Sequence, residues 1–257
     1  MLYDLLNEYK RHVVGTHQPA TAQTYYKRLC SLFEGQSLFH TIEKLDIDKI
    51  LGKLGEIKHK NYFSQSKNAF LHFCEFKGIK LSDKVLENIK ELEQGTKKKY
   101  RKMKVTHYKS VDSKIKHSKN KKLKLSFQVM SATGLRVSEL ASLISANCTI
   151  TADEITFSFI GKGGASEAVT LKKTDKPKLY ENVKELIENT PPNKKIFYSA
   201  IYLQNKAKEM GFRPHDLRRA YAKLEYKKTG SKTHVRDKLR HSSVKTTNIY
   251  LRSKIKI

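Results

Sequence analysis

The sequence predicts a mainly α-helical protein with one small β-hairpin, organised as two domains. Apolar residues recur at helical spacing along most of the chain, whereas strand-like alternation is confined to residues 155–171. A dense basic run after Gly95 interrupts the helical pattern, and 257 residues, 38% of them hydrophobic, suffice for a core on each side of it. The predicted segments are a helical domain over 1–94, a basic interdomain linker over 95–105 and a mixed, mostly helical domain over 106–257.

The first domain is predicted to be a small helical bundle. Its helices are expected near residues 2–9, 19–33, 42–54, 62–76 and 85–92. Pro19 is suited to open the second of these, and Gly78 to stop the fourth. Because the Phe and Tyr residues keep helical spacing, we expect most of them in a core rather than stacked on nucleic-acid bases.

The second domain is predicted to begin with a lysine-rich helix and a buried helix, over 108–117 and 123–130. Gly134 then makes a turn, so Arg136 stands at the start of a further helix, where it can project into a cleft. The strands 155–160 and 167–171 form a hairpin with Lys162 near its tip. Its Gly-Lys-Gly-Gly turn lacks the spacing of a phosphate-binding P-loop. Further helices are expected over 177–188 and 198–210.

The charge is concentrated in the second part of the chain. The whole sequence has 52 Lys and Arg against 25 Asp and Glu, a formal net charge of +27. Residues 1–95 hold 14 of the basic and 12 of the acidic residues, so residues 96–257 hold the other 38 and 13. A solvated lysine-rich surface would spread its charge more evenly. The concentration therefore favours a polyanionic partner.

The cysteine and hydropathy patterns bear on the compartment. Cys30, Cys74 and Cys148 are widely spaced and follow no metal-ligand or disulfide pattern. The N-terminus lacks the basic and apolar regions of a secretion signal, and no stretch approaches the ~20 apolar residues of a membrane span. We therefore expect a soluble protein of a reducing compartment, the cytoplasm.

The linker is a candidate DNA-binding segment. Six of its eight residues from Lys97 to Lys104 are basic. A run of like charge repels itself and extends, so it can lie along a DNA backbone, although a plain flexible tether explains it equally well. The candidate contacts are Lys97, Lys98, Lys99, Arg101, Lys102 and Lys104.

The last forty-odd residues gather the groups that cleavage of a phosphodiester would need. His215 and Arg218 are three residues apart, so on a helix they share a face and can grip one phosphate. His241 and then Tyr250 follow in a segment rich in Ser and Thr. Together these residues offer anion donors, proton handlers and a phenolic nucleophile, which is the inventory of a DNA-cleaving site.

The chemistry assigns a role to each residue type. Charge that grows on the non-bridging oxygens calls for planar, permanently charged guanidinium groups, for which Arg136 and Arg218 are the candidates. The leaving 5′ oxygen needs a general acid, and Lys162 on the hairpin fits that role. His215 and His241 would orient or accept the tyrosyl proton, and Tyr250 would form the covalent bond. No metal or other cofactor is implied, because the cations are side chains.

These motifs resemble those of the tyrosine recombinases, the phage-integrase family. The resemblance rests on Thr-Gly-Leu-Arg-Val-Ser-Glu-Leu around Arg136, Gly-Lys-Gly around Lys162, His-Asp-Leu-Arg from His215 to Arg218, and the segment from His241 to Tyr250. It implies that the two arginines bind the scissile phosphate, that Lys162 is the general acid, that the histidines assist and that Tyr250 is the nucleophile. It also implies a helical core-binding domain, a catalytic domain, and monomers that assemble into a homotetramer on two DNA sites.

The chain departs from the family pattern at three places. Arg240 stands where a glycine is common, and Arg219 where many members have another histidine. Only Leu251 to Ile257 follow Tyr250, whereas many members dock a longer C-terminal helix on a neighbouring protomer. The chain is also too short for the arm-binding domain of larger integrases. We therefore expect a two-domain recombinase acting on short core sites.

Several functions fit these expectations. The first is a site-specific recombinase that cuts and rejoins strands through a 3′-phosphotyrosine, for integration or excision of a mobile element or for replicon resolution. The alternatives are relaxation of DNA in the manner of a type IB topoisomerase, which the helical first domain disfavours, and a DNA-binding protein with an unused site. Covalent adduct formation on a nicked site would separate them.

Overall fold

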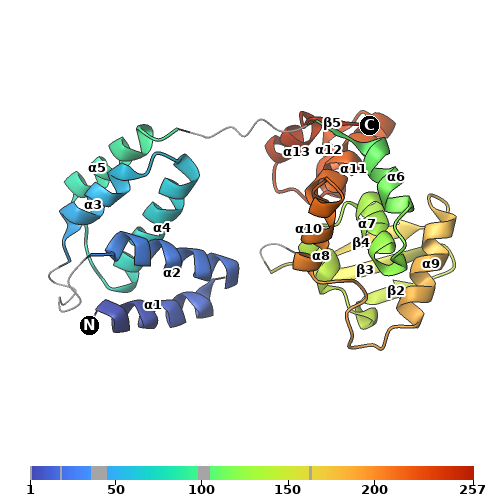
Figure 1. Cartoon of the computed structure of the whole chain (residues 1–257), viewed down its shortest axis with the longest axis horizontal. Helices are drawn as coiled ribbons and strands as arrows, with labels where there is room; N and C mark the ends of the chain where they lie inside the picture. The colour runs from blue at the N-terminus through green and yellow to red at the C-terminus, as the bar shows by residue number, and fades with distance from the viewer. Residues whose placement is uncertain (1, 18, 36–44, 98–104, 162–163) are drawn as a thin grey trace. The chain divides into compact units, whose positions relative to one another are not determined.

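The computed structural model describes residues 2–17, 19–35, 45–97, 105–161 and 164–257 (Figure 1). Two compact units divide the chain, Met1–Lys102 and Met103–Ile257. In the residues just given, both units are mostly helical, and strands occur only in the second. The predicted fold class, mainly α with a small hairpin, is confirmed.

The first unit is a helical bundle. Within the described residues its helices are α1 (Leu2–Thr16), α2 (Pro19–Phe33), α3 (Ile47–Glu56), α4 (Lys60–Phe76) and α5 (Asp83–Gln94). Side chains cap two of them: Asp46 accepts a hydrogen bond from the Lys49 amide at 2.9 Å, and Ser82 from the Val85 amide at 3.4 Å. The third helix was predicted to begin at Ile42, but α3 begins at Ile47, and residues 36–44 lie outside the described part.

Aromatic rings fill the core of this unit. Phe63, Phe70 and Phe73 of α4 are fully buried, and so is Tyr9 of α1. The rings of Tyr9 and Phe73 meet edge to face, with centroids 5.4 Å apart. The prediction that the helically spaced aromatic residues pack in a core is therefore confirmed for these four.

The start of the predicted linker is hydrogen-bonded to the first unit. The Gly95 amide bonds to the carbonyl of Glu91 at 3.2 Å, and the Thr96 hydroxyl to that of Glu93 at 2.7 Å. Lys97 forms a parallel bridge with His59, its amide donating to the Lys58 carbonyl at 3.1 Å. The predicted linker is therefore folded onto the first unit as far as Lys97.

The second unit combines helices with a small antiparallel sheet. Its described helices are α6 (Tyr108–Lys116), α7 (Lys121–Thr133), α8 (Val137–Ser142), α9 (Pro177–Glu188), α10 (Ala200–Glu209), α11 (Pro214–Thr229), α12 (Lys232–Lys238) and α13 (Val244–Leu251), with a 3₁₀ turn at Ser145–Asn147. Its strands are β1 (Thr106–His107), β2 (Cys148–Ile150), β3 (Glu154–Ile160), β4 (Ser166–Lys172) and β5 (Ile255–Lys256). In Figure 1, α9 lies beside the sheet.

The hairpin is part of a three-stranded sheet of order β2-β3-β4. Ile155, Phe157 and Phe159 alternate along β3 toward the core and are at most 5% exposed. The strand β2 was not predicted, because three residues are too few for an alternating pattern. A second small sheet pairs β1 with β5 in parallel, so the end of the chain packs on the start of its own unit.

The helix α7 leads to the site through a left-handed glycine. Gly134 follows α7 with φ 69°, and its amide closes the last turn on the Met130 carbonyl at 3.0 Å. A Cβ atom at this position would lie 2.6 Å from a ring carbon of Tyr221 on α11. Glycine is therefore required twice here, by its backbone conformation and by the close approach of α11.

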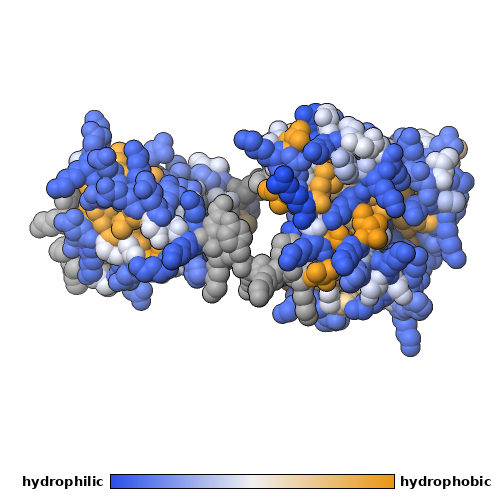
Figure 2. All heavy atoms as spheres, turned by 90° about the horizontal axis from the view of Figure 1, so that it is seen from above, coloured by the Kyte–Doolittle hydropathy of each residue, from blue (hydrophilic) through white to orange (hydrophobic). Residues whose placement is uncertain are grey.

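Hydrophilic side chains dominate the face of each unit that Figure 2 shows, with scattered apolar patches between them. In the part of the chain that the structure describes, no helix combines the length and apolarity that a membrane crossing requires.

Candidate active site

The structure brings together five of the six predicted catalytic residues in the second unit. Arg136 precedes α8, His215 and Arg218 lie in the first turn of α11, and His241 follows α12. Tyr250 is in the last turn of α13. Five separate positions in the sequence thus converge on one region.

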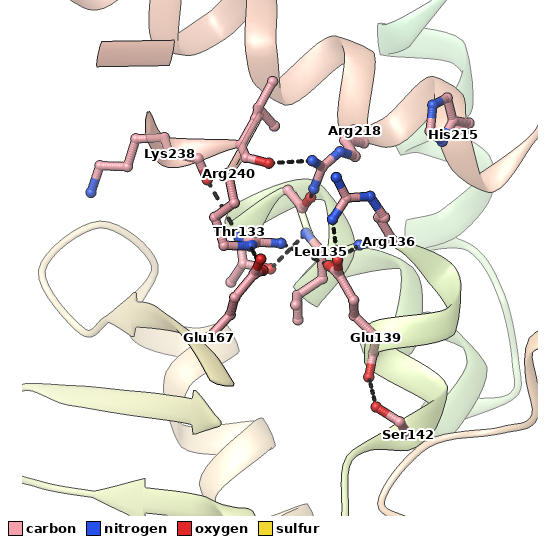
Figure 3. Close-up of polar contacts among 12 residues, drawn as sticks. Thr133, Leu135, Arg136, Glu139, Ser142, Glu167, His215, Arg218, Lys238 and Arg240 are labelled. Atoms are coloured by element: carbon pink, nitrogen blue, oxygen red, sulfur yellow. Dashed lines mark hydrogen bonds and ion pairs between the residues drawn. The ribbon is translucent and has the colours of Figure 1, made fainter. Parts of the chain in front are cut away.

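The two arginines approach each other from α8 and α11. Figure 3 shows the guanidinium groups of Arg136 and Arg218 close together. The charge of Arg136 also contributes to a lowered pKa of Arg218, to about 10, after the larger effect of burial. Like charges are held together only where the surrounding protein fixes them, and here the Glu139 carboxylate binds Arg136 and its charge also acts on Arg218.

Arg136 is fixed by a buried glutamate. Its main-chain amide donates to Oε2 of Glu139 at 2.7 Å, and its guanidinium donates to Oε1 of the same carboxylate. The bond from the Arg136 amide to the Glu139 carboxylate caps the first turn of α8 and is the local reason why the helix begins at Val137. Glu139 is 4% exposed, whereas the Arg136 side chain is 24% exposed. The anchored end of the arginine is therefore buried and part of its surface remains open.

Arg218 is completely buried. Its two terminal nitrogens donate to the main-chain carbonyls of Gly134 and Leu239, and Nε has no partner among the described residues. These bonds tie α11 to the turn after α7 and to the end of α12. They leave each terminal nitrogen with a second hydrogen, because a guanidinium carries five N–H groups.

The first turn of α11 is built to present His215 and Arg218. Pro214 opens the helix, and Asp216 accepts a hydrogen bond from the Arg213 amide at 3.0 Å. The other carboxylate oxygen of Asp216 pairs with Arg219 at 3.1 Å. Arg219, which departs from the family pattern, is therefore engaged with Asp216 in this structure.

Tyr250 reaches the site within the same chain. Its hydroxyl is hydrogen-bonded to Nε2 of His215, and the two ring centroids are 5.2 Å apart. The residue His215 is exposed, but loss of hydration against its neighbours and the charges of Arg219 and Arg218 lower its pKa to about 4. The imidazole is neutral at neutral pH, so one of its nitrogens can accept the tyrosyl hydrogen bond.

His241 also packs against Tyr250. Its ring centroid is 4.7 Å from that of Tyr250, and Nδ1 is 3.0 Å from the hydroxyl of the buried Thr247. Burial and the nearby charges of Arg218 and Arg136 lower its pKa to about 4. Nε2 is buried and has no partner in the described part of the chain.

Of the other predicted residues, only Lys97 lies in the described part of the chain. Lys162 lies outside the described residues, as do Lys98, Lys99, Arg101, Lys102 and Lys104. Gly161, at the end of β3, is described, and its amide bonds to the Ala165 carbonyl at 2.8 Å. Lys97 is exposed beside α4 of the first unit.

Three residues of the site were missed from the sequence: Glu139, Glu167 and Thr247. Glu139 could have been found, because a glutamate three residues after a helix cap is the signal of a capping box. Glu167 and Thr247 carry no local signal, since their partners Arg240 and His241 are identified only by the fold. Among the described residues no group of His, Cys, Asp and Glu could hold a metal ion.

Comparison with solved structures identifies the fold. A lambda integrase dimer bound to a COC′ core site matches with a TM-score of 0.65 at 18% identity, covering 97% of this chain and 77% of that one. The XerH site-specific recombinase bound to its difH substrate, a pre-cleavage complex, matches with 0.60 at 19% identity, covering 89% and 74%. The Tn1549 transposon integrase in complex with transposon right end DNA matches with 0.65 at 13% identity, covering 97% and 95%.

The sequence was also compared with curated proteins and with protein families. No curated protein matches it. The sequence model of the phage integrase family matches residues 101–256, which is more than half of the chain and includes all six predicted catalytic residues. The chain therefore belongs to the phage integrase family, the tyrosine recombinases.

Proposed function

We propose that this protein is a site-specific DNA recombinase that cleaves and rejoins strands through a covalent 3′-phosphotyrosine. Family membership supports site-specific recombination in general terms. The observation that carries the finer proposal is the hydrogen bond of the Tyr250 hydroxyl to His215 beside the arginine pair. A phenol, a neutral imidazole and two guanidinium groups in one place are what in-line attack on a phosphodiester requires.

The proposed reaction proceeds by exchange of one ester bond for another. The Tyr250 oxygen attacks the scissile phosphorus while the bond from phosphorus to the 5′ oxygen breaks, leaving a 3′-phosphotyrosine. His215 takes the tyrosyl proton, and Lys162 gives a proton to the departing 5′ oxygen. Attack by the 5′ hydroxyl of another strand reverses these steps. No nucleotide cofactor is consumed, because the phosphotyrosine replaces the broken ester.

The arginines and His241 are assigned to the phosphate. Arg136 offers its partly exposed guanidinium, and Arg218 offers the hydrogens that its two carbonyl partners leave unused. The free Nε2 of His241 adds a further group when it carries a hydrogen. Donors that are already held in place need no reorganisation as the charge develops, which is the main source of rate enhancement in such a site.

The proposed partner is double-stranded DNA, held by both units and by the basic segment between them. The excess of 38 basic over 13 acidic residues in 96–257 supports this assignment. By resemblance, two DNA sites would be brought together by a homotetramer. The biological outcome would be integration, excision or replicon resolution.

One experiment tests the reaction. A labelled duplex with a nick in its core, built from inverted repeats that flank the coding gene, is incubated with the protein and resolved on a denaturing gel. The expected result is a covalent adduct whose digestion leaves phosphate on Tyr250, together with recombinant strands. Tyr250→Phe should bind the duplex and give no adduct, whereas Tyr226→Phe, which removes a phenol elsewhere in the unit, should give the normal amount.

The other outcomes are equally decisive. Relaxation of a supercoiled plasmid through an adduct, without strand exchange between sites, would replace recombination with a topoisomerase activity. Binding without any adduct would leave a DNA-binding protein. An adduct that survives Tyr250→Phe would move the nucleophile to another tyrosine.

A further inference from the structure

Arg240 occupies an unusual position immediately before His241. Its φ is 54°, and it is the sole non-glycine residue with positive φ in the part of the chain that the structure describes. An L-residue in this region is strained, and glycine would adopt it freely. A side chain retained at such a backbone position indicates that its contacts offset the strain.

Two carboxylates from separate elements hold the Arg240 guanidinium. Nε donates to Oε2 of Glu167 on β4 at 2.7 Å, and a terminal nitrogen donates to Oε2 of Glu139 on α8 at 2.7 Å (Figure 3). The guanidinium also lies over the ring of Phe159 on β3, 5.1 Å from its centroid. The side chain is 12% exposed, so this is not a solvated surface pair.

Glu139 links Arg240 to Arg136. The Oε2 atom that accepts from Arg240 also accepts from the Arg136 amide at 2.7 Å, and Oε1 accepts from the Arg136 guanidinium. Burial on its own raises the pKa of this carboxyl, but the Arg136 amide and the charge of Arg240 outweigh it and the pKa is lowered. Glu139 is therefore a carboxylate shared by two arginines, and its position depends on both.

The polar contacts of Arg240 are all made within the protein. Nε and one terminal nitrogen are engaged with Glu167 and Glu139, and the other terminal nitrogen faces the Lys238 carbonyl at 3.4 Å. The contacts of Arg240 are thus directed inward, to groups that support the site.

We propose that Arg240 is a positioning residue that locks Glu139, and through it Arg136, to the start of β4 at Glu167. One guanidinium thereby joins the hairpin, the start of α8 and the turn that carries His241. Its effect on cleavage rests on the proposed recombinase function, whereas the tie between α8 and β4 does not. A single lysine ammonium could not span the two carboxylates with the same fork geometry.

The test uses variants of the full chain that separate the side chain from the backbone. Arg240→Gly removes the guanidinium and relieves the positive φ, so any loss cannot come from backbone strain. Arg240→Lys keeps the charge, and Glu167→Gln removes the negative charge from the contact to β4 alone. Arg236→Ala is the matched control, because its guanidinium pairs at 2.7 Å with the exposed neighbour Asp237. Thermal unfolding of each variant establishes that it is folded.

Three readouts are followed, namely adduct formation, DNA affinity and hydrogen–deuterium exchange. Single-turnover adduct formation on the nicked duplex is expected to slow by about tenfold or more in Arg240→Gly, because small misplacement of a phosphate donor is costly. DNA affinity should stay within about twofold, since the contacts of Arg240 are made within the protein. Hydrogen–deuterium exchange should speed up in residues 137–142 and 166–172. Arg240→Lys should recover only part of the cleavage rate and of the protection from hydrogen–deuterium exchange. Arg236→Ala should behave as the parent protein.

The mutations of Arg240 and Glu167 should also be non-additive, since they break one contact. An Arg240→Gly variant with the cleavage rate and the hydrogen–deuterium exchange of the parent protein would overturn the proposal. Additive effects of the Arg240 and Glu167 mutations would overturn it as well. If Arg240→Gly fails to fold, Arg240→Lys and Glu167→Gln decide by the same criteria. If the parent protein forms no adduct, the proposed recombinase function fails. The hydrogen–deuterium exchange data alone then confirm or reject the link that Arg240 makes between α8 and β4.

Discussion

The Tyr250 hydroxyl and the His215 imidazole are hydrogen-bonded within one chain, across 35 residues of sequence. The contact sets the proposed nucleophile against a group that can take its proton. The His241 ring packs on the same tyrosine, with centroids 4.7 Å apart. The tyrosine is thus held from two sides, and it is 8% exposed.

Replacing His215 by Phe should therefore slow adduct formation without removing Tyr250 from the site. The ring contact is retained in this variant while the proton acceptor is lost. We expect the single-turnover rate to fall on the order of 10²- to 10⁴-fold, the usual contribution of a general base. Quantified adduct on the nicked duplex gives the measurement, and unchanged rates would assign the tyrosyl proton to another group. His215→Gln, which keeps an acceptor, should lose less.

Arg218→Ala should affect stability as well as cleavage. The variant leaves the buried carbonyls of Gly134 and Leu239 without donors, and it opens a cavity in the place of a fully buried side chain. We expect a loss of roughly 2–5 kcal/mol in the free energy of unfolding, measured with urea. Arg236→Ala, which breaks a partly exposed ion pair, should cost less than about 1 kcal/mol. Equal losses would mean that the two carbonyl contacts contribute nothing.

Gly134→Ala tests the approach of α11 to the turn after α7. The added Cβ would lie 2.6 Å from a ring carbon of Tyr221, at a residue with φ 69°. The left-handed backbone costs about 1–2 kcal/mol and the overlap a further 1–3 kcal/mol. Gly230→Ala is the matched control, because Gly230 has φ 65° after α11 and open space around its Cβ position. Urea unfolding should show the larger loss for Gly134→Ala, and losses of the same size would refute a steric requirement at Gly134.

The main features of the fold were predictable from local signals. The burial of Ile155, Phe157 and Phe159 follows their alternation, and Pro214 with Asp216 marks the start of α11. The strands β1 and β5 were not predictable, since two residues each carry no period and their pairing joins opposite ends of the unit. Long-range pairing of this kind is decided by tertiary packing.

The site shows the same difference between local sequence signals, which could be recognised, and long-range contacts, which could not. The order of Arg136, Lys162, His215, Arg218, His241 and Tyr250 could be recognised in the sequence, whereas the supporting contacts could not. Arg240 was noticed only as a departure from a common glycine. Its partners Glu167 and Glu139 are 73 and 101 residues away, and no spacing rule connects them. Glu139 alone had a local signal, its place three residues after Arg136.

Acid should destabilise the second unit through His241. Its pKa in the folded protein is about 4, below the ordinary value of 6.5, because it is 8% exposed and faces Arg218, Arg136, His215 and Arg240. Above pH 6.5 the imidazole is neutral in both states and costs nothing. As the pH falls from 6.5 toward 4 the unfolded chain takes up the proton and the folded chain does not, so stability is lost.

His241→Gln isolates this effect from all other titrating groups. The shift from 6.5 to about 4 corresponds to a loss on the order of 3 kcal/mol by pH 4 in the parent protein. The variant loses the group, so the difference in free energy of unfolding between parent and variant should change in favour of the variant by that order as the pH is lowered. Urea unfolding at intervals between pH 7.5 and about 4.5 measures the difference, because the contributions of the other groups cancel in it. A difference that stays constant over this range would mean that His241 is protonated as easily in the folded protein as in the unfolded chain, and that the arginines do not hold it neutral.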